Sequence, residues 1–191
     1  AILQYLYKRG VTADQIIQRH LGYCARGKYS GCLIVPVFDL DGQVVSFQAR
    51  RVIGNGPKSL NPPNGKGLLY GVEHAKNHTG LIIVEGPFDA IAVHSLMAEK
   101  APFLSAVALL GHHCSDEQAA YVARVLKPEI VWVALDPDVS TEEKHKVGAL
   151  LVRNGCHDVR VAELTADPDE VNFDQWIDAL TNAQCAKPVV P

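Results

Sequence analysis

The sequence lacks the patterns that mark a zinc site or a membrane protein. Its five cysteines form no C-x-x-C pair, so we expect no zinc in this chain. No apolar run is long enough to span a bilayer and no signal-peptide pattern is present, so we expect no membrane partner. Scattered cysteines of odd number are typical of reduced thiols, which predicts a cytoplasmic location.

The two common glycine-rich phosphate loops are also missing. The sequence has no G-x-x-x-x-G-K-S/T segment and no G-x-G-x-x-G segment after an apolar run. An acidic domain that binds a small phosphorylated ligand through such a loop is therefore the least supported function for this chain.

What the sequence does contain is an ordinary globular composition with an uneven distribution of charge. The 191 residues are 48% hydrophobic and 20% charged, enough for one or two domains with a core. Residues 1–80 hold ten Lys or Arg and four Asp or Glu, whereas residues 81–191 hold eight and seventeen. Chance and solvated surfaces are the plain explanation. The sharper hypothesis is a basic half that meets a polyanion and an acidic half that holds metal.

The basic half has the pattern of a small α+β unit. Thr12-Ala13-Asp14-Gln15 resembles a capping box and opens a short helix. Residues 32–38 and 43–52 are typical of two strands, and Asp41-Gly42 between them predicts a hairpin turn.

From residue 80 onward, apolar strands alternate with helical segments. The predicted strands cover residues 81–84, 106–110, 130–135 and 159–164, and helical patterns follow them. This alternation predicts a parallel sheet with helices on both faces. The fold class is therefore α/β, a parallel sheet flanked by helices and preceded by a smaller α+β subdomain with a β-hairpin. The expected parts are a basic subdomain over 1–78, a sheet domain over 79–165, and an acidic motif with a terminal helix over 166–191.

The turn after the first predicted strand of the sheet is the most informative stretch. The apolar run 81–84 ends in Glu85, Gly86 permits a sharp turn, and Pro87 suits the first turn of a helix that also holds Asp89. Glu85 is therefore expected at the carboxyl end of a strand, the edge at which open α/β sheets bind their ligands.

Two more acidic clusters follow later strands, Asp136-Pro137-Asp138 and Asp167-Pro168-Asp169-Glu170. Residues two apart in extended chain point the same way, so each pair of aspartates can face one ion. Carboxylates are the ligands of Mg²⁺ in proteins, and two such ions can clamp a phosphoryl displacement. We therefore predict a two-metal site for Mg²⁺ or Mn²⁺, with Glu85 as a general acid or base.

Basic residues gather at the end of the hairpin and in the loop that follows it. Arg50 and Arg51 end the second strand, and Lys58 and Lys66 lie in a loop over 54–67 that is rich in Gly, Pro and Asn. Such residues on exposed backbone can bind phosphates, and a merely soluble loop is the plain alternative.

These motifs together resemble the Toprim domain and core of bacterial-type, DnaG-like DNA primases. The matching segments of the acidic half are V-E-G-P-F-D at 84–89, L-D-P-D at 135–138 and D-P-D-E at 167–170. Those of the basic half are Y-L-Y-K-R-G at 5–10, the hairpin at 35–50, P-K-S-L-N at 57–61 and L-Y-G at 69–71. The resemblance covers the chain to about residue 173.

The resemblance implies metal-dependent synthesis of RNA primers from NTPs on a single-stranded DNA template, a step of DNA replication. It implies that Glu85 is the general acid or base and that Asp136 and Asp138 bind metal. The supporting acids would be Asp89, Asp167 and Asp169. Template or nucleotide would be contacted by Arg50, Lys58, Asn61 and Lys66, with Arg51 beside them. Gly86 and Gly111 would let the backbone approach the site closely.

The sequence also departs from the family. Ala166 stands where the family has a lysine before D-P-D-E, and Val139-Ser140-Thr141 differs from the family's pattern after Asp138. The match starts and stops inside the usual core. We therefore expect a core truncated at both ends, a fragment or a reduced homologue from a mobile element. It would work with a separate zinc-binding module and a replicative helicase. A non-catalytic module that binds single-stranded DNA, and a Toprim nuclease or strand-joining enzyme, stay open as alternatives.

Overall fold

The computed structural model describes residues 1–62, 65 and 67–187, and the chain forms two compact units. The first unit is Ala1–Lys66 and the second is Gly67–Pro191. This division lies before the expected boundary at residue 78, because the segment after residue 67 pairs with the second sheet. The N–H of Tyr70 donates to Ala108 O at 2.9 Å, and the N–H of Ala108 donates to Tyr70 O at 3.0 Å.

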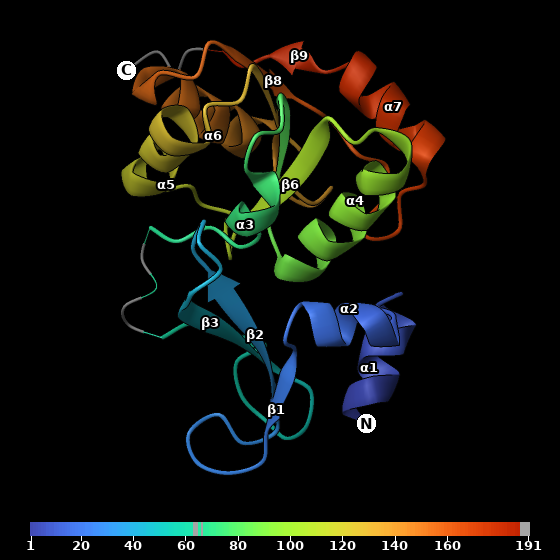
Figure 1. Cartoon of the computed structure of the whole chain (residues 1–191). Coiled ribbons are helices and arrows are strands. Elements are labelled where there is room, and N and C mark those ends of the chain that lie inside the picture. The colour runs from blue at the N-terminus through green and yellow to red at the C-terminus, as the bar shows by residue number, and fades with distance from the viewer. Residues whose placement is uncertain (63–64, 66, 188–191) are drawn as a thin grey trace. The chain divides into compact units, whose positions relative to one another are not determined.

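The first unit is an antiparallel sheet preceded by two short helices, with strand order β1-β2-β3-β4 (Figure 1). Its elements are α1 (Ile2–Lys8), α2 (Ala13–Gln18), β1 (Gly22–Cys24), β2 (Cys32–Phe38), β3 (Val44–Arg51) and β4 (Ser59–Leu60). The predicted capping box is confirmed, since Thr12 Oγ1 accepts from the N–H of Gln15 and Gln15 Oε1 accepts from the N–H of Thr12. The sequence pattern therefore located the start of α2 correctly.

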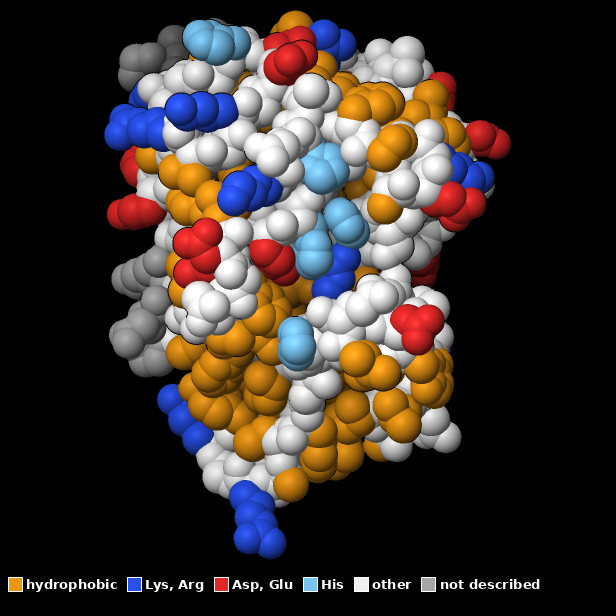
Figure 2. Space-filling view, viewed as in Figure 1, with side chains coloured by type: hydrophobic (Ala, Val, Ile, Leu, Met, Phe, Trp, Pro, Cys, Tyr) orange, Lys and Arg blue, Asp and Glu red, His pale blue; other side chains and the backbone are white. Residues whose placement is uncertain are grey.

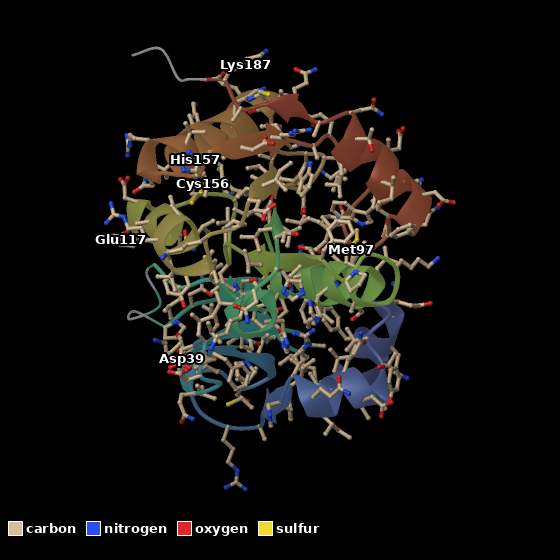
Figure 3. The ribbon with its side chains drawn as sticks, turned by 45° about the horizontal axis from the view of Figure 1, so that its top comes forward. Asp39, Met97, Glu117, Cys156, His157 and Lys187 are labelled. Carbon is tan, nitrogen blue, oxygen red and sulfur yellow. The ribbon has the colours of Figure 1, made fainter. Side chains whose placement is uncertain are left out.

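The predicted hairpin is formed by β2 and β3, which are joined by a tight turn. Asp39, labelled in Figure 3, closes this turn, because its Oδ1 accepts from the N–H of Asp41 at 3.0 Å and of Gln43 at 2.9 Å. Gly42 adopts φ +75°, a value that glycine reaches without strain. The register then sets Arg50 opposite Leu33 at the far end of the hairpin.

The first unit leaves many apolar side chains exposed, and Figure 2 shows hydrophobic side chains gathered over its visible face. The large ones that are exposed are Leu3, Tyr7, Ile17, Tyr23, Val44, Val45 and Ile53. A unit of this size buries only about 60% of its unfolded surface, so one thin sheet with two short helices cannot cover all of them.

The second unit is a five-stranded sheet in the order β6-β5-β7-β8-β9. Its strands are β5 (Gly80–Val84), β6 (Leu104–Ala108), β7 (Ile130–Val133), β8 (Asp158–Val161) and β9 (Gln184–Cys185). The pairs formed by the first four strands are parallel, and β9 runs antiparallel to β8. The predicted α/β class is therefore confirmed.

Helices cover both faces of this sheet, and Figure 1 shows α4 and α7 on one side with α5 and α6 on the other. The helices are α3 (Val72–Ala75), α4 (Pro87–Lys100), α5 (Asp116–Tyr121), the π-helix η1 (Val122–Leu126), α6 (Thr141–Asn154) and α7 (Phe173–Thr181). None of the described helices is long and apolar enough to cross a membrane.

The core of the second unit is centred on β5. All five of its residues are buried, because β6 and β7 flank the strand and helices pack on both faces. Met97 of α4, labelled in Figure 3, is also fully buried. A central parallel strand of this kind needs apolar residues at consecutive positions, which explains the uninterrupted aliphatic run.

The strand limits differ from those predicted where apolar residues continue past the sheet. β6 ends at Ala108 rather than residue 110, and Leu110 adopts φ +65°, which strand geometry excludes. β7 ends at Val133, although Ala134 and Leu135 stay buried. β9 was not predicted, since two exposed residues carry no strand pattern.

We expect Trp176→Ala to lower the free energy of unfolding by about 3–5 kcal/mol, because this fully buried side chain of α7 would leave a cavity. The neighbouring Ile177 is 39% exposed, so Ile177→Ala is a matched control that should cost less than about 1 kcal/mol. Urea unfolding followed by circular dichroism measures both values. Equal losses in the two variants would contradict the assignment of Trp176 to the core.

Candidate metal centre

Glu85 and Asp136 leave neighbouring strands at the same edge of the sheet. β5 and β7 pair in parallel with Ile83 opposite Val133, and the N–H of Ala134 then donates to Ile83 O at 2.9 Å. Glu85 directly follows β5, and Asp136 follows β7 closely. The N–H of Asp136 donates to Glu85 Oε1 at 3.3 Å. The parallel register therefore brings together two acids that are far apart in the sequence.

Asp138 joins these two residues in a compact acidic cluster. One carboxylate oxygen from each of Glu85, Asp136 and Asp138 lies within 4.8 Å of the others. No second group of three or more His, Cys, Asp or Glu meets this criterion among the residues that the structure describes. Glu85 and Asp136 are half-buried and Asp138 is exposed, so the cluster is open to solvent on one side. Carboxylate oxygens at this spacing suit a hard divalent cation.

One buried oxygen of the cluster lacks a hydrogen-bond partner among the described residues. Asp136 Oδ1 is buried and has no hydrogen-bond partner in the described part of the chain. Desolvation of a charged oxygen without such a partner costs free energy. The donor set thus fits Mg²⁺ or Mn²⁺, because a bound cation would satisfy this oxygen and offset the charge around it.

The environment of Asp136 opposes its ionisation. Burial is the main cause that raises the pKa of Asp136 to about 6, and the charges of Glu85, Asp167, Asp138 and Asp169 raise it further. The four neighbouring carboxylates therefore all lie near enough to Asp136 to act on its charge. Crowding of this kind becomes favourable when a cation offsets the charges, so it suits a metal site.

Asp167 and Asp169 lie after β8, at the same edge of the sheet as the cluster. Asp167 is exposed and Asp169 is half-buried. Both act on Asp136 through their charge, but neither is part of the group whose oxygens lie within 4.8 Å. The structure thus brings the third acidic motif near the other two and sets it slightly apart.

Asp89 has a different position from the other predicted acids. It is 8% exposed in the first turn of α4, and its Oδ2 accepts from the N–H of Gly86 at 2.9 Å. A Cβ added to Gly86 would lie 2.8 Å from that oxygen, so the glycine makes room for the contact. Asp89 lies outside the compact cluster of three and holds the turn that follows Glu85.

Gly111, in the loop after β6, contacts the backbone of the site. Its N–H donates to Glu85 O at 3.2 Å, so the loop after β6 lies against the loop after β5. A Cβ on Gly111 would meet nothing within 4 Å, and the positive φ belongs to Leu110. The close approach is therefore made by the main chain, and the space around Gly111 does not require glycine.

The predicted nucleic-acid residues lie in the first unit, where local contacts orient the two arginines. Arg50 Nε donates to Tyr5 Oη at 3.1 Å, and its Nη1 donates to Ser59 Oγ at 3.0 Å. Arg51 Nη1 donates to Ser30 O at 3.3 Å. Both guanidinium groups are thus oriented by neighbours in α1, in β4 and in the loop before β2.

The remaining basic and polar positions are more exposed. Lys58 is exposed beside β4, and the exposed Asn61 accepts through Oδ1 from Gln48 Nε2 at 3.0 Å. Lys66 lies outside the described residues.

Comparison with known proteins matches this site to one domain family. A Toprim-like family matches residues 82–172, a segment that contains every carboxylate discussed above. The DNA primase of Clostridium acetobutylicum is 28% identical over 183 residues, which cover 88% of this chain and 30% of that protein. The DNA primase of Halalkalibacterium halodurans is 31% identical over 180 residues, which cover 89% of this chain and 28% of that protein.

Solved structures of primases have the same fold. The DnaG catalytic core is 20% identical with a TM-score of 0.79, over 97% of this chain and 73% of that one. The DnaG primase catalytic domain bound to single-stranded DNA is 19% identical with a TM-score of 0.75, over 97% and 74%. The chain contains a DnaG-like primase Toprim core. It spans less than a third of the length of the two curated primases.

The Toprim core also contains a buried lysine, Lys144, that sequence reasoning missed. Lys144 of α6 is only 1% exposed, and its Nζ lies 2.6 Å from Glu163 Oε2. Thr141 Oγ1 donates to the other oxygen of Glu163 at 2.8 Å. Lys144 lies on the buried face of α6 with Val147 and Leu151. The sequence gave no signal for this, because the burial of a lysine depends on a partner from another element.

Lys144 also acts on the catalytic candidate Glu85. Burial is the main cause that raises the pKa of Glu85, and the charges of Asp138 and Asp167 raise it further. The hydrogen bond from the Asp136 N–H and the charge of Lys144 work in the opposite direction. The nearby acids therefore oppose the ionisation of Glu85, and the buried ammonium group of Lys144 favours it.

The raised pKa of Asp136 should make the stability of the metal-free Toprim core depend on pH. Native Asp136 keeps its proton up to about pH 6, whereas the unfolded chain releases it near the ordinary value of 3.8. Between these values the native state binds more protons, so the free energy of unfolding falls as pH rises through this window. We expect Asp136→Asn to remove that fall and to be more stable than the wild type near neutral pH.

Urea unfolding in the presence of a chelator, at about pH 4.5 and about pH 7, measures this effect. Glu99→Gln is the matched control, because it also removes one carboxylate, but an exposed one on α4. An Asp136→Asn protein less stable than the wild type at the higher pH would contradict the prediction.

Proposed function

We propose that this chain carries the catalytic centre of a primase, which makes RNA primers on single-stranded DNA by metal-dependent nucleotidyl transfer. The observation that supports this most is the unpartnered, buried Oδ1 of Asp136 inside a cluster of three carboxylates at the carboxyl edge of the sheet. The cluster alone supports metal binding. The DnaG-like fold around it is the reason why we propose primer synthesis in particular.

Mg²⁺ or Mn²⁺ would be held by Asp136 and Asp138, with Asp167 and Asp169 in support through their charge. Asp89 would support the site from behind Glu85. When bound, two such ions would stabilise the charge on the attacking and leaving oxygens of a phosphoryl displacement. The crowding that raises the pKa of Asp136 would be relieved by a cation in the same place.

Glu85 would accept the proton released in the reaction. The 3′-hydroxyl of the primer attacks the α-phosphate of an NTP, a new O–P bond forms, the bond to pyrophosphate breaks, and the hydroxyl proton needs a base. Burial raises the pKa of Glu85 toward neutrality, where a general base works best. We assign the proton transfer to Oε2, because Oε1 accepts from the N–H of Asp136.

Template and nucleotide would be bound by basic residues of the first unit, with Arg50, Arg51 and Lys58 contacting phosphates. Asn61 and Lys66 would extend this set along the loop. One structure with the same fold is that of a primase domain bound to single-stranded DNA, which supports this assignment. A replicative helicase and a separate zinc-binding module are the further partners that we propose, with the cytoplasm as the place of action.

One residue favours a second candidate function. Ala166 stands where the family resemblance expects a lysine, so a positive charge beside the third acidic motif is missing. A Toprim module that binds single-stranded DNA without making primers is consistent with that loss. Nuclease activity is a third outcome, which incubation with plasmid DNA and Mg²⁺ detects as nicking.

We expect Glu85→Gln to reduce primer synthesis by about 10²–10⁴-fold, because the general base would be lost. We expect Asp136→Asn with Asp138→Asn to lower the affinity for Mn²⁺ by at least about tenfold, since even supporting groups of metal sites contribute that much. The assays are incorporation of labelled NTPs on single-stranded DNA and calorimetric titration with Mn²⁺. The zinc-binding part of a bacterial primase is supplied separately in the first assay.

Glu99→Gln should match the wild type in both assays. DNA binding without any primer product, in the wild type and in the presence of the zinc-binding part, would reject primer synthesis in favour of the second candidate. Failure of the wild type to bind Mn²⁺ at millimolar concentration would reject the metal centre itself.

We expect Lys58→Ala to weaken binding of single-stranded DNA and to reduce the slope of log affinity against log salt by about one, because one phosphate contact would be lost. Lys100→Gln, which removes a charge from α4 in the second unit, is the control and should leave the slope unchanged. Fluorescence anisotropy of a labelled oligonucleotide over a salt series measures both. A slope unchanged in Lys58→Ala would contradict the assignment.

A further inference from the structure

Two cysteines of the first unit lie directly opposite each other, at the end of the ladder between β1 and β2. Cys24 is the last residue of β1, Cys32 is the first residue of β2, and the antiparallel register pairs the two. Opposite residues of an antiparallel pair point to the same face, with Cβ atoms about 4.5–5.5 Å apart. A disulfide needs about 3.5–4.5 Å between them, so a small approach of the strands suffices.

The backbone around the pair permits that approach. The N–H of Cys32 donates to Tyr29 O at 3.0 Å, and Cys24 O accepts from the N–H of Gly31 at 2.9 Å. The pair therefore does not exchange hydrogen bonds as a hydrogen-bonded ladder pair does, and pairs of the other kind have closer side chains. Its place at the end of the ladder, beside a loop, also leaves the strands free to adjust.

The two thiols differ in their exposure to solvent. Both are free, Cys24 is half-buried and Cys32 is completely buried. Cys24 Sγ lies 3.0 Å from Arg26 O and Cys32 Sγ lies 4.0 Å from Ser30 O, so both sulfurs contact the backbone of the same loop. An oxidant from solvent reaches Cys24, and Cys32 is the protected partner that can react with the product.

We infer that Cys24 and Cys32 form a reversible disulfide on exposure to a peroxide. The Cys24 sulfur attacks one peroxide oxygen and the O–O bond breaks, which leaves a sulfenic acid on Cys24 and one molecule of water. The Cys32 sulfur then attacks the sulfenic sulfur, the S–S bond forms, and the hydroxyl leaves as a second molecule of water. Overall, two thiols are oxidised and one hydrogen peroxide is reduced.

The bond closes the loop between the two strands into a covalent ring. This loop holds Arg26 and Lys28, both exposed, and Tyr29, whose ring packs edge-on against Phe47 with centroids 5.1 Å apart. Oxidation thus restricts a basic loop of the proposed DNA-binding unit, and reduction releases it. The inference depends only on the register of the two strands and holds whether or not the chain makes primers.

Trypsin provides a direct test, because its cleavage sites after Arg26 and Lys28 lie inside the ring. The full chain is reduced, treated with hydrogen peroxide, and cut under conditions that leave the fold intact. We expect oxidation to remove two of the five thiols. The two fragments of the nicked chain should then stay joined on a non-reducing gel and separate after reduction, and peptide mapping should find Cys24 linked to Cys32.

Matched variants show whether this pair is responsible. Cys24→Ser should abolish the link between the fragments, whereas Cys185→Ser, which removes an exposed thiol of the second unit, should leave it intact. Cys32→Ala should abolish the link as well. If this substitution of a buried residue prevents folding, Cys24→Ser still tests the inference. Burial raises the pKa of Cys114 to about 12 and of Cys156 to about 11, which makes both slow to react.

Two results would overturn the inference. One is a nicked, oxidised chain whose fragments separate without a reductant. The other is a peptide map in which peroxide oxidises Cys24 to sulfinic acid, or links it to a cysteine of the second unit, while Cys32 stays free.

Discussion

Repulsion between carboxylates at the carboxyl edge of β5 and β7 is the constraint on which the Toprim core depends. The parallel register puts the residues that follow the two strands side by side, so Glu85 and Asp136 come into contact whatever their charge. The sheet can hold them there because β5 is paired on both edges, with β6 and β7, and is buried on both faces. Burial energy of the core thus offsets the electrostatic cost of the site.

The structure reduces that cost in two ways that do not require a metal. The N–H of Asp136 donates to Glu85 Oε1, which favours the ionised form of Glu85. Lys144 is buried on α6 and its charge stabilises the ionised form of Glu85, although its direct partner is Glu163. Neither contact reaches Oδ1 of Asp136, which has no partner among the described residues. This oxygen of Asp136 therefore carries a desolvation cost that no described hydrogen bond offsets.

The sequence was enough to predict what depends on local pattern. The apolar run before Glu85 gave the central strand, and the spacing of the three acidic motifs gave the edge at which they meet. The burial of Lys144 and the short strand β9 could not be predicted, because both depend on contacts with elements distant in the sequence. The boundary near residue 66 was missed for the same reason, since Tyr70 joins the second sheet through a single bridge to Ala108.

The segment from Glu85 to Asp89 holds two acids with different local contacts. Asp89 caps the turn at Gly86, and this contact fixes the direction in which the chain leaves β5. A Cβ at Gly86 would lie 2.8 Å from Asp89 Oδ2, so the Asp89 side chain would have to move and the contact with the turn would be disturbed. Asp89 therefore contacts the turn that follows Glu85, whereas the carboxylates that lie within 4.8 Å of one another are those of Glu85, Asp136 and Asp138. Asp89 thus has a positioning role beside Glu85, the residue to which we assign proton transfer in the proposed function.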